Sequence, residues 1–186
     1  MIGSERTRYD SVAMLIHWIT AALMIFMIFF GEELMEAGEE AEEAGEALSG
    51  TFGPSLHVSI GVAILLLTLL RILWRVTHKA PPYPVTMKRY EVIGSAALHG
   101  LFYVLLIGLP ITGWLAFGGF VAEEPAMAGV RVFSAFPLPE APFSLPKGPH
   151  ALGSNVAMVL TGLHILAALK HQFVDGDGLF RRMLPI

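Results

Sequence analysis

Four long uncharged runs restrict the chain to one class of protein, an integral membrane protein. They cover residues 11–30, 52–70, 92–122 and 148–169, and each is near or above the roughly 18–20 residues that a helix needs to cross a bilayer. Lipid offers no hydrogen bonds, so spans this apolar must pair their backbone groups within a helix. An outer-membrane barrel would show alternating strands instead of continuous Leu, Ile, Phe and Met. The sequence therefore predicts an all-α four-helix membrane bundle.

The predicted bundle is a single domain over residues 1–186, with two long connections on one side of the membrane. The expected spans are about 11–30, 55–75, 92–117 and 149–172, and the two connections are a Glu-rich loop at 31–50 and a long loop at 118–148. In the Glu-rich loop, Glu32, Glu36, Glu39, Glu40 and Glu43 repeat at a helical spacing, which predicts a short amphipathic helix at the membrane surface. Its charged face is either simply solvated or a docking patch for a basic partner.

The basic residues that flank the spans predict the orientation. Ten lie on one side, with Arg131 and Lys147 on the other. The ten are Arg6, Arg8, Arg71, Arg75, Lys79, Lys88, Arg89, Lys170, Arg181 and Arg182. Because cytoplasmic loops carry the excess of Lys and Arg, both termini and the 75–91 loop are expected in the cytoplasm. The Glu-rich loop and the 118–148 loop then face outward.

The chain has no cysteine, which excludes disulfides, iron–sulfur clusters and the covalent attachment of a c-type haem. A metal cofactor would have to be held by His, Met or carboxylates. Six of the seven histidines lie inside or at the ends of the apolar runs, namely His17, His57, His99, His150, His164 and His171. Ionisable side chains at membrane depth are costly and usually mark a site, although one such His is as often a hydrogen-bonded structural residue.

The alternating direction of the spans sets the depth of each histidine. His57 and His150 begin the second and fourth spans on the outer side, whereas His17 and His164 lie at a comparable depth near the cytoplasmic side. His150 and His164 are fourteen residues apart, which is 40° short of four helical turns, so they share one helix face about 21 Å apart. The fourth span therefore lies beside two stacked sites, one near each surface.

Small residues accompany these histidines. Ser154, Ala157 and Thr161 share the face of His150 and His164, and Gly61 follows His57 by one turn. Close helix packing in a membrane explains such residues equally well, but between two axially spaced histidines they leave room for a flat macrocycle. Zinc or copper sites would need three or four clustered donors. Two facing imidazoles suit axial ligation of haem iron, and we expect two haems b that have no open coordination position and transfer electrons.

The chain resembles the bacterial cytochrome b561 family, whose cytochrome fold recurs in the membrane subunits of nickel–iron hydrogenases and formate dehydrogenases. The segments that carry the resemblance are RYDSVAMLIHW, HVSIGVAILLLTLLRILWR, LHGLFYVLLIGLPITGW and HALGSNVAMVLTGLHILAALKHQFVDGDGLFRRMLP. The last is the most specific. The resemblance implies the haem ligand pairs His17 with His164 and His57 with His150. It also implies residence in the bacterial inner membrane.

His99 and His171 are secondary candidates. His99 lies at the depth of His17 and competes with it as the partner of His164, but the resemblance favours His17. His171 is two turns beyond His164, where it would anchor a quinone, shuttle the protons of a quinone, or simply contact water and lipid phosphate. Arg71, Arg75, Arg181 and Arg182 suit haem propionates or lipid phosphates, and their positive-inside role explains them equally well.

The expected function is a di-haem b membrane cytochrome that moves electrons between a periplasmic donor or acceptor and membrane quinone. The resemblance implies superoxide oxidation coupled to ubiquinone reduction as one form of this activity, although eight Glu residues between 32 and 46 would repel superoxide. The alternative is a haem-carrying membrane-anchor subunit of a larger dehydrogenase or hydrogenase. Lipid, quinone and a periplasmic redox partner or superoxide are the expected partners, and nucleic acid is not.

Overall fold

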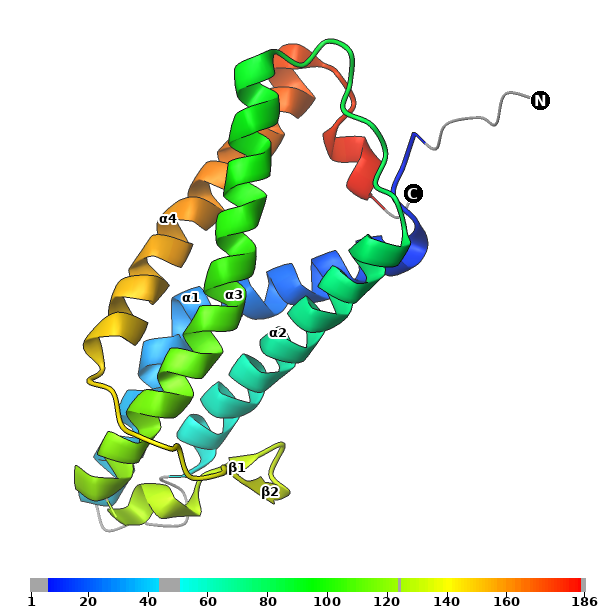
Figure 1. Ribbon diagram of the computed structural model, residues 1–186. Helices are drawn as coiled ribbons and strands as arrows, with labels where there is room; N and C mark the ends of the chain where they lie inside the picture. The colour runs from blue at the N-terminus through cyan, green and yellow to red at the C-terminus, as the bar shows by residue number, and fades with distance from the viewer. Residues whose placement is uncertain (1–6, 44–50, 124, 185–186) are drawn as a thin grey trace.

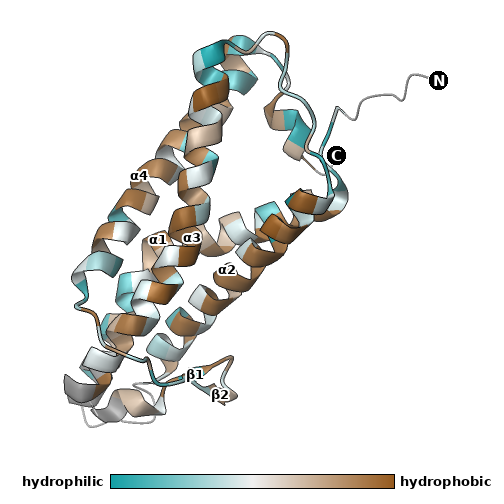
Figure 2. Cartoon of the chain, in the orientation of Figure 1, coloured by the Kyte–Doolittle hydropathy of each residue, from teal (hydrophilic) through white to brown (hydrophobic). Residues whose placement is uncertain are grey.

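The four apolar runs form four long helices in the computed structural model, which describes residues 7–43, 51–123 and 125–184. They are α1 Ser11–Glu43, α2 Phe52–Thr77, α3 Arg89–Glu123 and α4 Gly148–Lys170 (Figure 1). Each is long and apolar enough to cross a membrane. Large apolar side chains such as Leu73, Val104 and Leu166 are more than half exposed on these helices (Figure 2). Lipid would cover them, so the chain is a multi-pass membrane protein with the predicted all-α bundle.

Two of the helices, α1 and α3, are longer than the hydropathy of the sequence predicts. The first half of the Glu-rich segment is not a loop, because α1 continues without interruption to Glu43. Glu and Ala are strong helix formers, so the helix persists after the apolar run ends. Likewise α3 continues past the expected end near Phe117 to Glu123, with Pro110 inside it. Residues 44–50, the rest of the Glu-rich segment, lie outside the described residues.

The 118–148 segment contains short elements that the sequence did not reveal. A 3-10 turn, η1 Pro125–Gly129, precedes a hairpin of β1 Arg131–Val132 and β2 Phe136–Pro137. Phe133 and Ser134, at the hairpin turn, both have positive φ, which is unusual for residues with side chains. The hairpin is anchored on the first turns of α2, because Ser59 Oγ accepts a hydrogen bond of 2.7 Å from Phe133 N.

The packing between helices is uneven. The closest backbone packing joins α1 to α2, and α3 packs against α4 and α2, whereas α4 packs much less against α1 and α2. At the α1–α2 contact, Gly53 lies directly against the carbonyl of Leu34, where a Cβ has no space. In α4 only Ala157 is buried among the described residues. The space between α4 and the α1–α2 pair is where the histidines meet.

The described segments nearest the termini, residues 7–10 and 180–184, lie at the same end of the bundle, away from the hairpin (Figure 1). After α4, a π-helical turn η2 His171–Asp175 and a 3-10 turn η3 Phe180–Met183 lead the chain back to the start of α1. There Trp18 Nε1 donates to Met183 O at 2.6 Å, and Tyr9 N donates to Arg182 O at 3.2 Å. The C-terminal segment thus closes the bundle end that holds the start of α1.

Candidate functional site

The first histidine pair joins α2 and α4 at the hairpin end of the bundle. The ring centroids of His57 and His150 are 6.1 Å apart, and both side chains are half-buried. His57 Nδ1 donates to Gly31 O in α1 at 2.8 Å, and His150 Nδ1 donates to Leu109 O in α3 at 2.9 Å. A carbonyl can only accept, so each ring carries its proton on Nδ1 and leaves the lone pair of Nε2 free. Free Nε2 atoms are what a shared metal requires.

Glycines allow neighbouring helices to approach these two rings. A Cβ on Gly113 would lie 3.0 Å from Cε1 and 3.1 Å from Nδ1 of His150, which is tighter than ordinary contact. A Cβ on Gly31 would meet the His57 ring at 3.7 Å. By contrast, a Cβ on Gly61 would meet nothing within 4 Å, so space is open one turn after His57. The rings are closely held by α1 and α3, while open space remains beside α2.

The second histidine cluster lies nearer the end that carries the termini and contains three imidazoles. The His164 ring centroid is 6.3 Å from that of His17 and 5.4 Å from that of His99. Phe102 packs edge-on against the same His164 ring at 5.5 Å. His99 Nδ1 donates to Ser95 O at 2.6 Å, so its Nε2 is also free. The structure therefore brings together the expected pair His17–His164, with the competitor His99 beside them.

His17 differs from His57, His150 and His99, whose Nδ1 atoms contact backbone carbonyls. Its Nδ1 lies 2.7 Å from Nη1 of Arg71, a guanidinium nitrogen of α2. A guanidinium can only donate, so this contact requires Nδ1 to be the acceptor and, in a neutral ring, puts the proton on Nε2. In this arrangement the ring cannot offer Nε2 to a metal. His17 can ligate through Nε2 only after Arg71 moves away.

The spacing of both expected pairs fits an iron bound between two imidazoles. A metal lies about 2 Å from each ligating nitrogen and the nitrogen about 1 Å from its ring centre, so the two centroids would be roughly 6 Å apart. The observed separations are 6.1 Å and 6.3 Å. The residues present therefore fit bis-histidine haem, with His57 and His150 already oriented for it and His17 restrained by Arg71.

A polar network at the far end of α4 was largely missed by sequence reasoning. His171 is buried, and its Nδ1 lies 2.7 Å from Oδ2 of Asp177 and 3.1 Å from Oδ2 of Asp175. Lys170 Nζ bridges Asp175 at 2.5 Å and Glu91 at 2.7 Å. Glu91, His171 and Asp175 are the group of three closely placed metal-ligating side chains in the described chain. The ammonium of Lys170 already provides the positive charge there.

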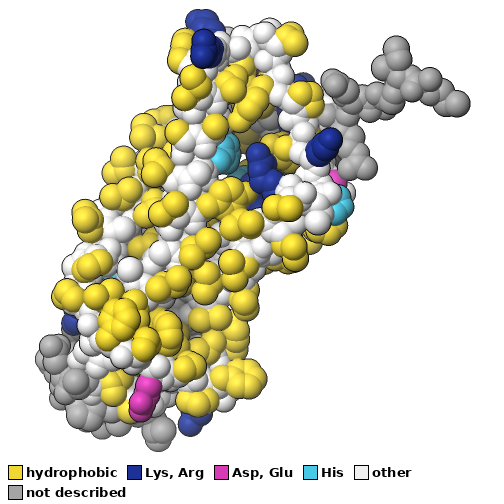
Figure 3. Space-filling view, viewed as in Figure 1, with side chains coloured by type: hydrophobic (Ala, Val, Ile, Leu, Met, Phe, Trp, Pro, Cys, Tyr) yellow, Lys and Arg dark blue, Asp and Glu magenta, His cyan; other side chains and the backbone are white. Residues whose placement is uncertain are grey.

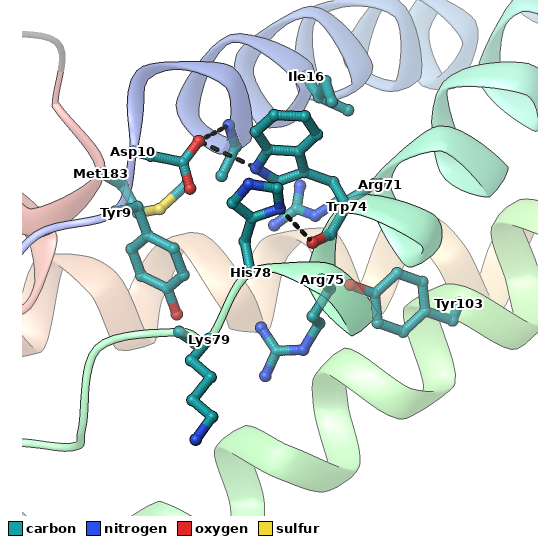
Figure 4. Close-up of a pocket in the computed structure, with 12 residues that line it drawn as sticks. Tyr9, Asp10, Ile16, Arg71, Trp74, Arg75, His78, Lys79, Tyr103 and Met183 are labelled. Atoms are coloured by element: carbon teal, nitrogen blue, oxygen red, sulfur yellow. Dashed lines mark hydrogen bonds between the residues drawn. The ribbon is translucent and has the colours of Figure 1, made fainter.

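A hollow opens beside His17, between the start of α1, the end of α2 and Tyr103 in the middle of α3 (Figure 4). Arg71, Arg75 and Lys79 contribute cations to its wall. Figure 3 shows basic side chains and a histidine in an opening of the apolar surface toward this end. The acid of the hollow, Asp10, accepts from Trp74 Nε1 at 3.0 Å and from Ala13 N at 2.9 Å. Burial raises the pKa of Asp10, but these two hydrogen bonds outweigh burial and hold it below its usual value.

Comparison with known proteins shows which family this chain is similar to. The family model for prokaryotic cytochrome b561 matches residues 8–185. "Cytochrome b562" of Cereibacter sphaeroides is 31% identical over 97% of this chain and 98% of the relative. "Probable superoxide oxidase CybB" of Yersinia pestis is 28% identical, covering 96% of each chain. "Cytochrome b561 homolog 2" of Escherichia coli K12 is 27% identical over 95% of this chain and 91% of the relative.

Proposed function

Because the chain belongs to the prokaryotic cytochrome b561 family, whose members are haem-binding membrane electron carriers, we propose that it is a di-haem b cytochrome linking a periplasmic redox partner to quinone in the membrane. The observation that carries the proposal is the presence of two facing imidazole pairs with iron-compatible spacing, 6.1 Å and 6.3 Å. His57 and His150 would hold the outer haem. His17 and His164 would hold the inner one.

Haem supplies a one-electron carrier, and the chain decides what that carrier can do. If each imidazole pair held an iron from both sides, the haems would have no open site for oxygen chemistry and would be suited to outer-sphere electron transfer. The ligands on α4, His150 and His164, are separated by about 21 Å of helix rise. Two such sites stacked along α4 would form a path for electrons across the bilayer. The excess of Lys and Arg at the end with the termini supports the proposal that this end faces the cytoplasm of a bacterial inner membrane.

Reduction of a quinone consumes two protons, and His171 is suited to deliver them at the cytoplasmic end. It is buried, lies two turns after His164 on the same helix face, and is oriented through Nδ1 by the carboxylate of Asp177. The contacts use Nδ1, so Nε2 remains for a quinone oxygen. Lys170, Glu91 and Asp175 complete the charged groups around it. His99, with its free Nε2 beside His164, is the second residue proposed to contact quinone.

The outer partner is proposed to be superoxide, on the strength of the name of the Yersinia relative. In a balanced reaction, two superoxide anions would lose one electron each to form two molecules of oxygen, while one quinone takes two electrons and two protons. The exposed Glu32, Glu33, Glu36 and Glu40 on α1 oppose the approach of an anion. If superoxide is the donor, added salt should therefore speed its oxidation by screening these charges. A rate that falls with salt, or no oxidation at all, would remove superoxide as the donor.

The same acidic face favours a second candidate, a haem-carrying anchor subunit of a larger dehydrogenase or hydrogenase. A basic redox protein would bind the exposed Glu side chains of α1 by charge complementarity. Purification in mild detergent separates the two candidates. A single polypeptide that reduces quinone without help supports the first, whereas obligate co-purification with an iron–sulfur or other redox subunit supports the second.

The test of the di-haem assignment is a reduced-minus-oxidised spectrum with haem quantification per chain. The unsubstituted protein should hold two haems. Replacement of His57 or His150 by Ala should remove the outer haem alone, and replacement of His17 or His164 should remove the inner one alone. Replacement of His78, whose ring stacks on that of Trp74 and which belongs to neither pair, is the matched control and should leave two haems. A colourless protein would refute the ligand set. So would loss of the inner haem in His99→Ala together with its retention in His17→Ala.

A further inference from the structure

The cationic side chains that line the hollow beside His17 are not neutralised by nearby acidic side chains. Arg71 and Arg75 are one turn apart on α2, and Lys79 follows just after the end of that helix, so all three cations line the same hollow (Figure 4). The ion pairs of the described residues involve Lys170 and His171, and none of them includes these three cations. Asp10 does not neutralise them, because its carboxylate is bound by Ala13 and Trp74. The hollow is therefore suited to an anion from outside the chain.

Arg71 cannot keep its present contact in a protein whose His17 binds iron. When Nε2 ligates a metal, the remaining proton of a neutral imidazole sits on Nδ1. Nδ1–H and the guanidinium of Arg71, now 2.7 Å apart, would then both be donors facing each other. The guanidinium must leave the ring, and the hollow that it already lines lies next to it. Binding of iron at His17 and movement of Arg71 are thus coupled.

We infer that Arg71, together with Arg75 one turn further along α2, binds the propionate carboxylates of the haem held by His17 and His164. The inference rests on the proposed function. A haem b carries two carboxylates on one edge of its ring, and carboxylates at membrane depth need a cation. The planar guanidinium matches a carboxylate through two parallel hydrogen bonds. Released from His17, Arg71 would exchange a ring nitrogen for an oppositely charged partner. The same residue would thus contact His17 when haem is absent and bind a propionate when haem is present.

The assignment is specific to the inner site. At the outer site the Nδ1 atoms of His57 and His150 contact backbone carbonyls, and within the described part of the chain no cation contacts either ring. A phospholipid phosphate is the other anion that the hollow might attract, because basic pockets at the cytoplasmic side of helical bundles bind anionic head groups. The proximity of Arg71 to a haem ligand favours the carboxylate.

The test compares haem with haem dimethyl ester, whose two carboxylates are capped and uncharged. The background is full-length His57→Ala, which keeps only the inner site, produced without haem and titrated in detergent while the Soret band is followed. In this chain the ester should bind at least tenfold more weakly than haem. In the chain that carries both His57→Ala and Arg71→Gln, the affinities for haem and for the ester should agree within about twofold, because the partner of the carboxylate is gone. Arg89→Gln, which removes a charge at the same bundle end outside the hollow, should keep the tenfold ratio.

Each outcome decides the inference. If the ester binds the His57→Ala chain as tightly as haem does, the inference is overturned. This comparison needs no change at Arg71, so the inference remains testable even if the Arg71 variant does not fold. A tenfold ratio that persists in the Arg71→Gln chain also overturns it. If phosphatidylglycerol, added to the micelles, raises the melting temperature only when Arg71 is present and the ester ratio is one, lipid phosphate is the occupant instead. Failure of the His57→Ala chain to bind either haem refutes the proposed ligands, which is a different result.

Discussion

Gly113→Ala should weaken the outer haem and leave the inner haem unchanged. The added Cβ would lie 3.0 Å from Cε1 and 3.1 Å from Nδ1 of His150, so the ring must yield by a few tenths of an ångström. The ring has little freedom to yield, since its Nδ1 is hydrogen-bonded to Leu109 O on the same helix. Overpacking of this kind costs about 1–3 kcal/mol. If that cost falls on the haem-bound form, affinity at the outer site drops roughly 5- to 150-fold.

The assay is haem titration of the chain in a His17→Ala background, which retains the outer site, followed by the spectrum of the bound form. Gly108→Ala is the matched control, because it lies one and a half turns earlier on α3 and its Cβ would meet nothing within 4 Å. The control should bind haem as well as the parent, and its helix should be slightly more stable, since Ala is the better helix former. In a His57→Ala background, which retains the inner site, both glycine variants should behave alike.

Two results would refute this reasoning. If Gly113→Ala and Gly108→Ala bind the outer haem equally, the close approach of α3 does not set the position of the His150 ring. If Gly113→Ala weakens the inner haem as much as the outer one, the substitution disturbs the whole bundle and the local geometry around His150 is not responsible.

Two further predictions concern the end that carries the termini. Asp177→Asn should slow quinone reduction while both haem spectra stay unchanged, because the carboxylate that orients the His171 ring is lost; equal rates in stopped-flow reduction would contradict this role. Asp10 has a lowered pKa in the folded chain, so its contribution to stability is present above the ordinary aspartate pKa of 3.8 and is lost as the pH falls through the lower folded pKa. Thermal unfolding in detergent between pH 6 and pH 3, run as about half-unit steps, should therefore show a loss of melting temperature on acidification that is smaller in Asp10→Asn. An equal loss in both chains would contradict the Asp10 contribution.

The sequence predicted the elements that depend on local composition and on helical spacing. Uncharged runs longer than a bilayer crossing gave the four helices, and the fourteen-residue interval between His150 and His164 placed both on one face of α4. The juxtaposition of His57 with His150 and of His17 with His164 followed from the depth of each residue. Whether these pairs bind haem is a separate question that the titrations answer.

What the sequence could not predict depends on contacts between distant residues. Hydropathy ended the first span at residue 30, but helix propensity carries α1 through the Glu-rich segment to Glu43. No sequence pattern predicted the hairpin turn, because Phe133 and Ser134 adopt positive φ at positions where Gly or Asn is usual. Arg71 is 54 residues from His17, so no local pattern relates the two. Nor does any pattern select Gly31 and Leu109 as the carbonyls that orient the outer rings.

All four helices shape each site, although only two supply the expected ligands to it. At the outer site α2 and α4 carry the rings, while α1 and α3 orient them through the carbonyls of Gly31 and Leu109. At the inner site α1 and α4 carry the rings, while α2 supplies Arg71 and α3 supplies His99. Backbone carbonyls are fixed by their helices, whereas a guanidinium on a long side chain can move. On the proposed ligand assignment, the outer ligands would therefore be set before haem binds, and the inner site would form only as Arg71 moves away from His17. The inner haem would then depend more on its own carboxylates than the outer haem does.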